Sequence, residues 1–197
     1  MKPCHWLLLL FLATNAGAEP AAIETAAREG LPVEPVRSLI AEGQAKKVPA
    51  AELDAAVQRR LAALRLAKGL LQETGYTQCP AAQRQGLMGA VAQAMESRVS
   101  ESALHETLRA GGGSRTMRVQ AVVEAGESLQ LLGVDEATVA ALMQDFVERS
   151  LGRGEILRAM QFISQQHRSG MTGSQIRKSL WQRLPDSSTR ENNNQTK

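Results

Sequence analysis

The segment Gly30-Leu31-Pro32-Val33-Glu34-Pro35-Val36 contains a pattern that the rest of the chain repeats. After a glycine come an apolar residue and a helix-start position, and a second apolar residue stands five positions after the first. Proline is tolerated in a first helical turn because its missing N–H would have no partner there. An apolar pair with this separation matches a hydrophobic staple, in which the residue before the N-cap packs against N4. The segment therefore predicts the start of a helix.

Further copies of this pattern follow along the chain. Their first apolar residue and helix-start position are Val48-Pro49, Val99-Ser100, Val134-Asp135, Leu151-Gly152 and Met171-Thr172, with a weaker copy at Ala82-Gln83. Ser, Asp and Thr side chains can accept hydrogen bonds from the free amides of a first turn. Thr172 and Gln175 also match a capping box. The residues predicted to build helix starts are Gly30, Leu31, Pro32, Val48, Pro49, Ser100, Asp135 and Thr172.

The helix-start positions recur with offsets of 51 and 52 residues, in two series: Pro32, Gln83, Asp135 and Pro49, Ser100, Gly152. A repeat of this length is typical of stacked helical units. We therefore predict one helical domain over residues 19–184, with tandem units at 30–80, 81–132 and 133–184.

The fold class follows from the spacing of apolar residues. Leu53, Val57, Leu61 and Leu64 recur at helical spacing, and no segment alternates apolar and polar residues as a half-buried strand would. We predict an all-α fold of about 8 helices, stacked as antiparallel hairpins in a short repeat array or as an irregular bundle. Helices are expected near residues 20–28, 33–44, 50–73, 81–98, 101–110, 114–132, 136–150, 153–167 and 172–184.

The two ends of the chain differ in composition from the predicted domain. Lys2, an apolar run over 6–12 and Ala16-Gly17-Ala18 indicate a secretory signal peptide, residues 1–18, cleaved after Ala18. An uncleaved N-terminal anchor is the alternative. The apolar run is too short to span a bilayer, and no later segment is longer, so no transmembrane segment is expected after cleavage. The expected location is periplasmic or secreted. The polar tail 185–197 is predicted to be disordered.

Charge and cysteine content argue against two properties, nucleic-acid binding and an internal disulfide. The chain has 23 Lys and Arg against 20 Asp and Glu, and removal of Lys2 leaves 22 against 20. This balance argues against nucleic-acid binding, which usually requires a concentrated basic face. Cys79 is the only cysteine after cleavage, so no internal disulfide is expected in an oxidising compartment. It is either a free structural thiol or an interchain partner.

Candidate reactive residues lack the spacing that known chemistry requires. His105 has no second histidine of a zinc-protease helix, and His105, His167 and Cys79 have no metal-ligand spacing. The glycines at 111–113 resemble an anion-binding loop only loosely, and a flexible linker is the simpler interpretation. We therefore predict no enzyme activity, no cofactor and no metal.

Aromatic residues are scarce, at 3% of the chain. Ligand pockets usually contain more of them. Phe146, Phe162 and Trp181 are expected to lie mainly in the core, and they are the tentative contact patch if they are exposed together.

One phrase resembles a known group of proteins. Gly30-Leu31-Pro32, followed by residues 42–49 (Glu-Gly-Gln-Ala-Lys-Lys-Val-Pro), is similar to the wording G-L-P … E-G-x-A-K-G-V-P of small exported bacterial proteins built from short helical repeats. Lys47 stands where that wording often has glycine, and the later copies lose the proline. The resemblance implies export and a helical repeat, and it implies no reaction and no site residues.

Three hypotheses for function remain. The first is a non-enzymatic protein of the cell envelope that binds another envelope protein. The second is a binder of an anionic envelope ligand, a lipid or a glycan, that uses Arg59, Arg60, Arg115 and Arg118. The third is an enzyme or metal protein without a local motif.

Overall fold

A computed structural model describes residues 18–113 and 115–184 of the chain. The predicted all-α fold is confirmed, because these residues form α-helices and one 3₁₀ turn and contain no strand. The predicted signal peptide, apart from Ala18, and the predicted disordered tail lie outside the described residues. The elements are α1 Ala18–Arg28, α2 Glu34–Ala45, α3 Ala50–Glu73, η1 Tyr76–Gln78, α4 Ala81–Glu96, α5 Glu101–Gly111, α6 Thr116–Leu131, α7 Glu136–Glu148, α8 Arg153–Arg168 and α9 Gly173–Arg183.

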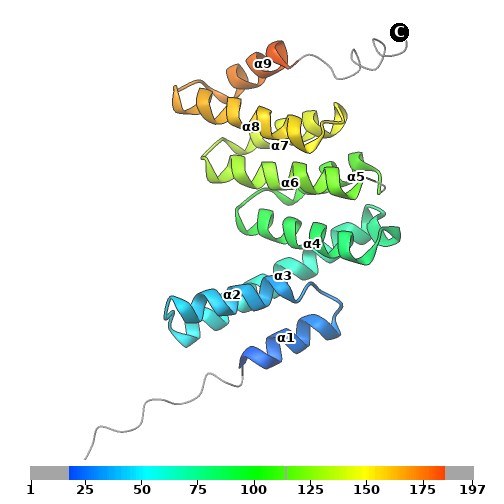
Figure 1. Cartoon of the computed structure of the whole chain (residues 1–197), viewed down its shortest axis with the longest axis vertical. Coiled ribbons are helices and arrows are strands. Elements are labelled where there is room, and N and C mark those ends of the chain that lie inside the picture. Colours follow the sequence, from blue (N-terminus) through cyan, green and yellow to red (C-terminus); the bar gives the residue numbers. More distant parts are fainter. Residues whose placement is uncertain (1–17, 114, 185–197) are drawn as a thin grey trace, which may run out of the picture.

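The helices are stacked in chain order along the long axis of the molecule, from α1 at one end to α9 at the other (Figure 1). They form two layers. Helices α4, α6 and α8 pack against one another in succession, and so do α3, α5, α7 and α9. The layers are joined where α3 meets α4, α6 meets α7 and α8 meets α9. None of the helices in the described part of the chain combines the length and hydropathy needed to cross a bilayer.

The core between the layers is continuous and mostly aliphatic. One cluster of buried side chains extends from Ala22 in α1 to Leu180 in α9. The largest fully buried side chains are those of Tyr76 and Phe146. Since dispersion and the removal of apolar surface from water both increase with contact area, this continuous cluster holds successive helices together.

Six junctions between helices share one geometry. At the α6–α7 junction, Gly133 has a φ of 81° and its N–H donates to the Gln130 carbonyl over 3.0 Å. The next N–H, of Val134, donates to the Leu129 carbonyl over 3.1 Å. These two bonds form a Schellman motif, which satisfies the last carbonyls of a helix. The residues with positive φ at the six junctions are Gly30, Lys47, Arg98, Gly133, Ser150 and Gly170.

At five of these six junctions, the apolar residue after the positive-φ position directly precedes the N-cap of the next helix. Val134 is the residue before the α7 N-cap, and Val134 and its staple partner Val139 are both buried. Asp135 accepts the Thr138 N–H over 2.9 Å, and this bond holds the pKa of the Asp135 carboxyl below its ordinary value. One side chain therefore closes α6 and orients the start of α7. The N-caps of this type are Pro49, Ser100, Asp135, Gly152 and Thr172.

Two helix starts depart from the expected positions. The N-cap of α2 is Val33, one residue after Pro32, and Pro35 occupies the first turn, where its missing N–H costs nothing. The weaker copy of the pattern at Gln83 does not mark a helix start, although the helix expected near residues 81–98 is present. Helix α4 begins at Ala81, because the extended backbone of Pro80 provides the N-cap and Gln83 lies within the first turn.

In the structure, positions that are 51 or 52 residues apart do not precede equivalent helices. Pro49, Ser100 and Gly152 precede α3, α5 and α8, which are two and three helices apart in the chain. Helix α8 belongs to the other layer from α3 and α5. What recurs along the chain is the helix junction.

Lys47 and Arg98 adopt positive φ values of 55° and 69° without being glycine. The left-handed region costs an L-residue roughly 1–2 kcal/mol, whereas the extra freedom of glycine in the unfolded chain costs about 0.4–1 kcal/mol. We expect Lys47→Gly and Arg98→Gly each to raise the free energy of unfolding by about 0.5–1 kcal/mol. Urea denaturation of each variant measures this change.

Gly133→Ala is the matched control for these two substitutions. A Cβ at Gly133 would have no neighbour within 4 Å, so only its φ of 81° resists the change. Loss of about 1 kcal/mol is expected. If the glycine variants were also destabilised, the assigned left-handed conformations would be incorrect.

Candidate functional site

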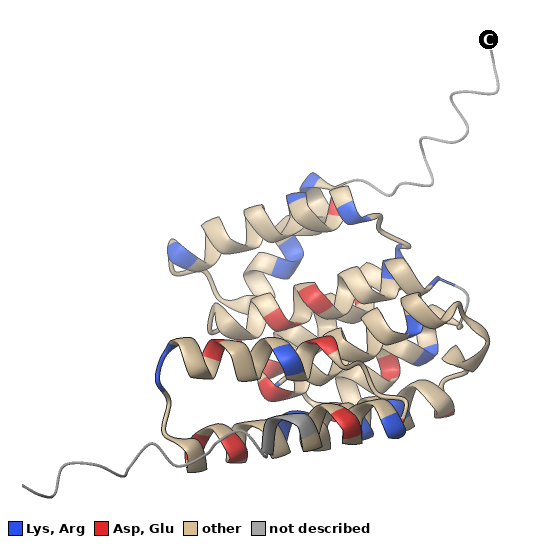
Figure 2. Cartoon of the chain, turned by 60° about the horizontal axis from the view of Figure 1, so that its bottom comes forward, with Lys and Arg blue, Asp and Glu red and all other residues tan. Residues whose placement is uncertain are grey.

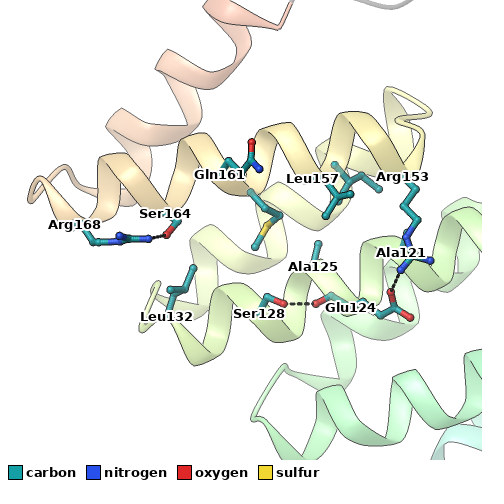
Figure 3. Close-up of a pocket in the computed structure, with 12 residues that line it drawn as sticks. Ala121, Glu124, Ala125, Ser128, Leu132, Arg153, Leu157, Gln161, Ser164 and Arg168 are labelled. Atoms are coloured by element: carbon teal, nitrogen blue, oxygen red, sulfur yellow. Dashed lines mark hydrogen bonds and ion pairs between the residues drawn. The ribbon is translucent and has the colours of Figure 1, made fainter.

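An open groove lies between α6 and α8, with a cavity volume of about 490 Å³. The side chains that line it come from one stripe of each helix, and Figure 3 shows the two helices side by side. Helix α6 and its C-cap contribute Ala121, Glu124, Ala125, Ser128 and Leu132, and helix α8 contributes Arg153, Ile156, Leu157, Met160, Gln161, Ser164 and Arg168.

The groove is open because α6 presents small side chains to it. Ala121 and Ala125 lie one helical turn apart, and their methyl groups leave space that a larger residue would fill. Opposite them, Leu157 remains 58% exposed. Leu132, at the end of α6, is 39% exposed. Apolar side chains of this size and exposure, gathered in one hollow, are typical of surfaces that bind a partner.

Charged groups mark both ends of the groove. At one end Arg153 lies 3.9 Å from the Glu124 carboxylate, which also accepts a 2.8 Å hydrogen bond from Gln120. The Arg153 side chain is 71% exposed, so the ion pair is weak and largely solvated. At the other end Arg168 donates to the Ser164 hydroxyl over 2.8 Å. The groove therefore combines an apolar floor with an arginine at each end.

Two further hollows lie on the same side of the array, where α2, α4 and α6 meet. Their volumes are about 620 and 570 Å³. The carboxylates in them already have partners in the protein, since Glu42 pairs with Lys46, Glu96 pairs with Arg60, and Glu127 accepts from Gln93. Acidic and basic residues are interspersed over the helices in Figure 2. What distinguishes the α6–α8 groove from these hollows is its large exposed apolar side chains, Leu157 and Leu132.

The three aromatic residues of the predicted contact patch have different surroundings. Phe146 is fully buried, so it offers no surface to a partner. Trp181 is partly buried and meets Phe146 edge to face, with ring centroids 6.1 Å apart. Phe162 is also partly buried, and the Arg183 guanidinium lies 5.3 Å from its ring centroid. The structure thus places these residues in and around the α7–α9 contact.

Asp145 organises this contact, and sequence reasoning did not identify it. Asp145 is 8% exposed, and its carboxylate accepts two hydrogen bonds from the Arg177 guanidinium, at 2.6 and 2.7 Å. The Trp181 indole N–H donates to the same carboxylate over 2.8 Å. The Arg149 guanidinium lies 4.2 Å from the Trp181 ring centroid. The hydrogen bonds that Arg177 donates to Asp145 raise the pKa of Arg177. These contacts fix α9 to α7.

Asp145→Asn is expected to lower the free energy of unfolding by about 1–2 kcal/mol. A hydrogen bond to a charged group contributes about 1.5–3 kcal/mol, and the 46% exposure of the Arg177 side chain reduces that value by screening. Thermal unfolding measures the loss, and the emission of Trp181 reports whether α9 separates from α7. Glu148→Gln removes the same charge from the same helix at an exposed position. Equal losses in the two variants would contradict the assigned role of Asp145.

The other candidate residues are not gathered into one site. Arg59 and Arg60 lie on α3, whereas Arg115 and Arg118 lie at the start of α6. Arg60 pairs with Glu96 over 2.7 Å, and Arg115 donates to the Ser150 hydroxyl over 3.1 Å. Within the described residues, no three His, Cys, Asp or Glu side chains are arranged to hold a metal ion, so His105, His167 and Cys79 do not meet.

The glycine-rich loop after α5 packs against the loop after α3. Tyr76 is fully buried and donates its hydroxyl to the Leu108 carbonyl over 3.1 Å. A Cβ at Gly113 would lie 2.9 Å from the Gly75 carbonyl oxygen. A Cβ at Gly111 would lie 2.5 Å from the Tyr76 hydroxyl oxygen. Glycine is therefore needed here for close contact between two loops.

Comparisons with known proteins add no relative. No protein-family model, curated protein or solved structure matches the chain. The α6–α8 groove is thus interpreted from its own residues. Its two walls come from segments about 30 positions apart, and the one local sign of it is Leu157, which lies beside the buried stripe of Ile156, Ala159 and Ile163.

Proposed function

We propose that this protein is an exported, non-enzymatic interaction module of the cell envelope that binds another protein through the α6–α8 groove. The observation that supports the proposal is the groove itself, where Leu157, Met160 and Leu132 line a hollow on the open side of a stacked helical array. Stacked helices expose an extended surface of this kind and bind partners along it. The export half of the proposal is based on the composition of residues 1–18.

Site-specific photo-crosslinking tests the binding half. A photoreactive amino acid at position 157 is expected to form covalent adducts with a defined envelope protein in intact cells. Leu66 on α3 is the matched control, because it is 54% exposed and absent from the groove, against 58% for Leu157. Equal adduct yields at the two positions would contradict the proposal.

Fractionation of the same cells tests the export half. The processed chain is expected in the envelope or the medium, with an N-terminus at Glu19, and N-terminal sequencing identifies it. A chain that retains residues 1–18 and stays in the cytoplasm would contradict export. Binding through the groove would still be judged by the crosslinking experiment alone.

A further inference from the structure

From the charge and shape of the α6–α8 groove we infer the chemistry of its occupant: an amphipathic helix with an apolar stripe and acidic residues at both ends. This inference depends on the proposed binding function. It names the class of partner that the groove fits.

The lining of the groove has the dimensions of a helix-binding channel. On α8 it includes residues 153, 157, 160, 164 and 168, which recur every three or four positions along one face. From Arg153 to Arg168 this face extends over about 22 Å at 1.5 Å per residue. A helix of about four turns therefore fits beside α8, with its own residues at i, i+3, i+4 and i+7 over the apolar floor.

The charge around the channel favours an acidic partner. The charged residues that line the channel are Arg153, Arg168 and Glu124, and Glu124 lies 3.9 Å from Arg153 and accepts from Gln120. Glu155 is the one acid of α8. The Glu155 carboxylate accepts the N–H of Gly152 over 2.9 Å, so it is engaged at the start of its own helix. Arg153 and Arg168 occupy the two ends of the groove. Carboxylates at the ends of a bound helix would meet these arginines, and such complementarity sets specificity and orientation.

The hollow form of the site favours a helix over a membrane surface. Ile156 is buried and Met160 partly buried, so they lie deeper than the exposed Leu157. The lining lies between two helices (Figure 3), where a convex object reaches it and a flat bilayer does not. Binding to a bilayer surface instead depends on an apolar face that projects outward.

Fluorescence anisotropy with synthetic peptides tests the inference on the mature chain. The probe is a labelled helical peptide of about 15 residues with a leucine stripe and glutamates at both ends. One comparison peptide carries lysines in place of the glutamates, and another has the same composition in scrambled order. The acidic peptide is expected to bind at least about tenfold more tightly than either one, and its affinity should fall as salt is added.

Matched variants locate the binding. Leu157→Asp and Arg168→Glu are each expected to weaken binding of the acidic peptide by about tenfold or more. Leu66→Asp and Arg158→Glu make the same changes at exposed positions that do not line the groove, and they should leave the affinity unchanged. Circular dichroism of all four variants checks that each retains the helical fold.

Three outcomes would overturn the inference. They are equal binding of the acidic and basic peptides, no binding of the acidic peptide, and binding to phosphatidylglycerol vesicles that is lost in Leu157→Asp while the peptide does not bind. Protein adducts at position 157 together with any of these results would preserve the proposed function and refute only the helix chemistry. Absence of specific adducts at position 157 would refute the proposed function itself.

Discussion

Tyr76→Ala is expected to lower the free energy of unfolding by about 3–5 kcal/mol, the range measured when buried aromatic residues are truncated. Tyr76 is 0% exposed and lies between the loop after α3 and the loop after α5. Truncation would leave a cavity, and it would remove the 3.1 Å hydrogen bond to the Leu108 carbonyl. Burial also raises the pKa of the Tyr76 phenol. A hydrogen bond from the Gly113 backbone lowers this pKa, but burial has the larger effect. Urea denaturation of the mature chain measures the loss.

Tyr76→Phe separates the two contributions. It keeps the ring and removes the hydroxyl, so a loss of about 1–2 kcal/mol is expected from the unsatisfied carbonyl. If Tyr76→Ala cost no more than Tyr76→Phe, the ring would not be packed as described, and the contact between the two loops would have to be reconsidered.

Leu31→Ser is expected to cost about 2–5 kcal/mol, the range for removing a large aliphatic side chain from a core. Leu31 is 2% exposed, and its N–H donates to the Ala26 carbonyl over 2.8 Å at the junction between α1 and α2. The substitution removes apolar contacts to both helices and places a hydroxyl in the core. Chemical denaturation and the helical signal at 222 nm measure the effect.

Val48→Ser is the matched comparison for Leu31→Ser. Val48 occupies the same place at the α2–α3 junction but is only partly buried. The sequence pattern is the same at the two positions, and by itself it would give them similar losses. The structure predicts a smaller loss at Val48, about 0.5–1.5 kcal/mol. Equal losses would mean that the junction geometry, and not burial, determines the cost.

Much of the helical framework could be predicted because its signals are local. The start of α3 at Ala50 and of α5 at Glu101 follow from a cap residue and an apolar pair within a few positions. Helix ends were less well defined where no glycine marks them. Lys47, Arg98 and Ser150 adopt the left-handed conformation through the Schellman hydrogen bonds, and their side chains give no indication of it.

The groove and the α7–α9 contact could not be predicted because they depend on distant pairs. Asp145 lies within the apolar sequence of α7, and its meaning becomes clear only beside Arg177, 32 positions later. Likewise Ala121 and Leu157 become two walls of one hollow only once α6 and α8 are packed. Neither residue has an unusual local sequence. Periodicity therefore assigns each one to a helix but does not indicate which residues it contacts.

The shared apolar residue at five of the helix junctions has a consequence for cooperativity. Because one side chain belongs to the end of one helix and the start of the next, fraying at a junction destabilises both helices together. Among the described residues, the loop at 74–80 lacks the second Schellman hydrogen bond and so lacks this coupling. In a linear array, stability depends on each unit and on its interfaces with neighbours. Helices α6, α7 and α8 are joined by two such junctions, so the two walls of the groove should lose their structure together.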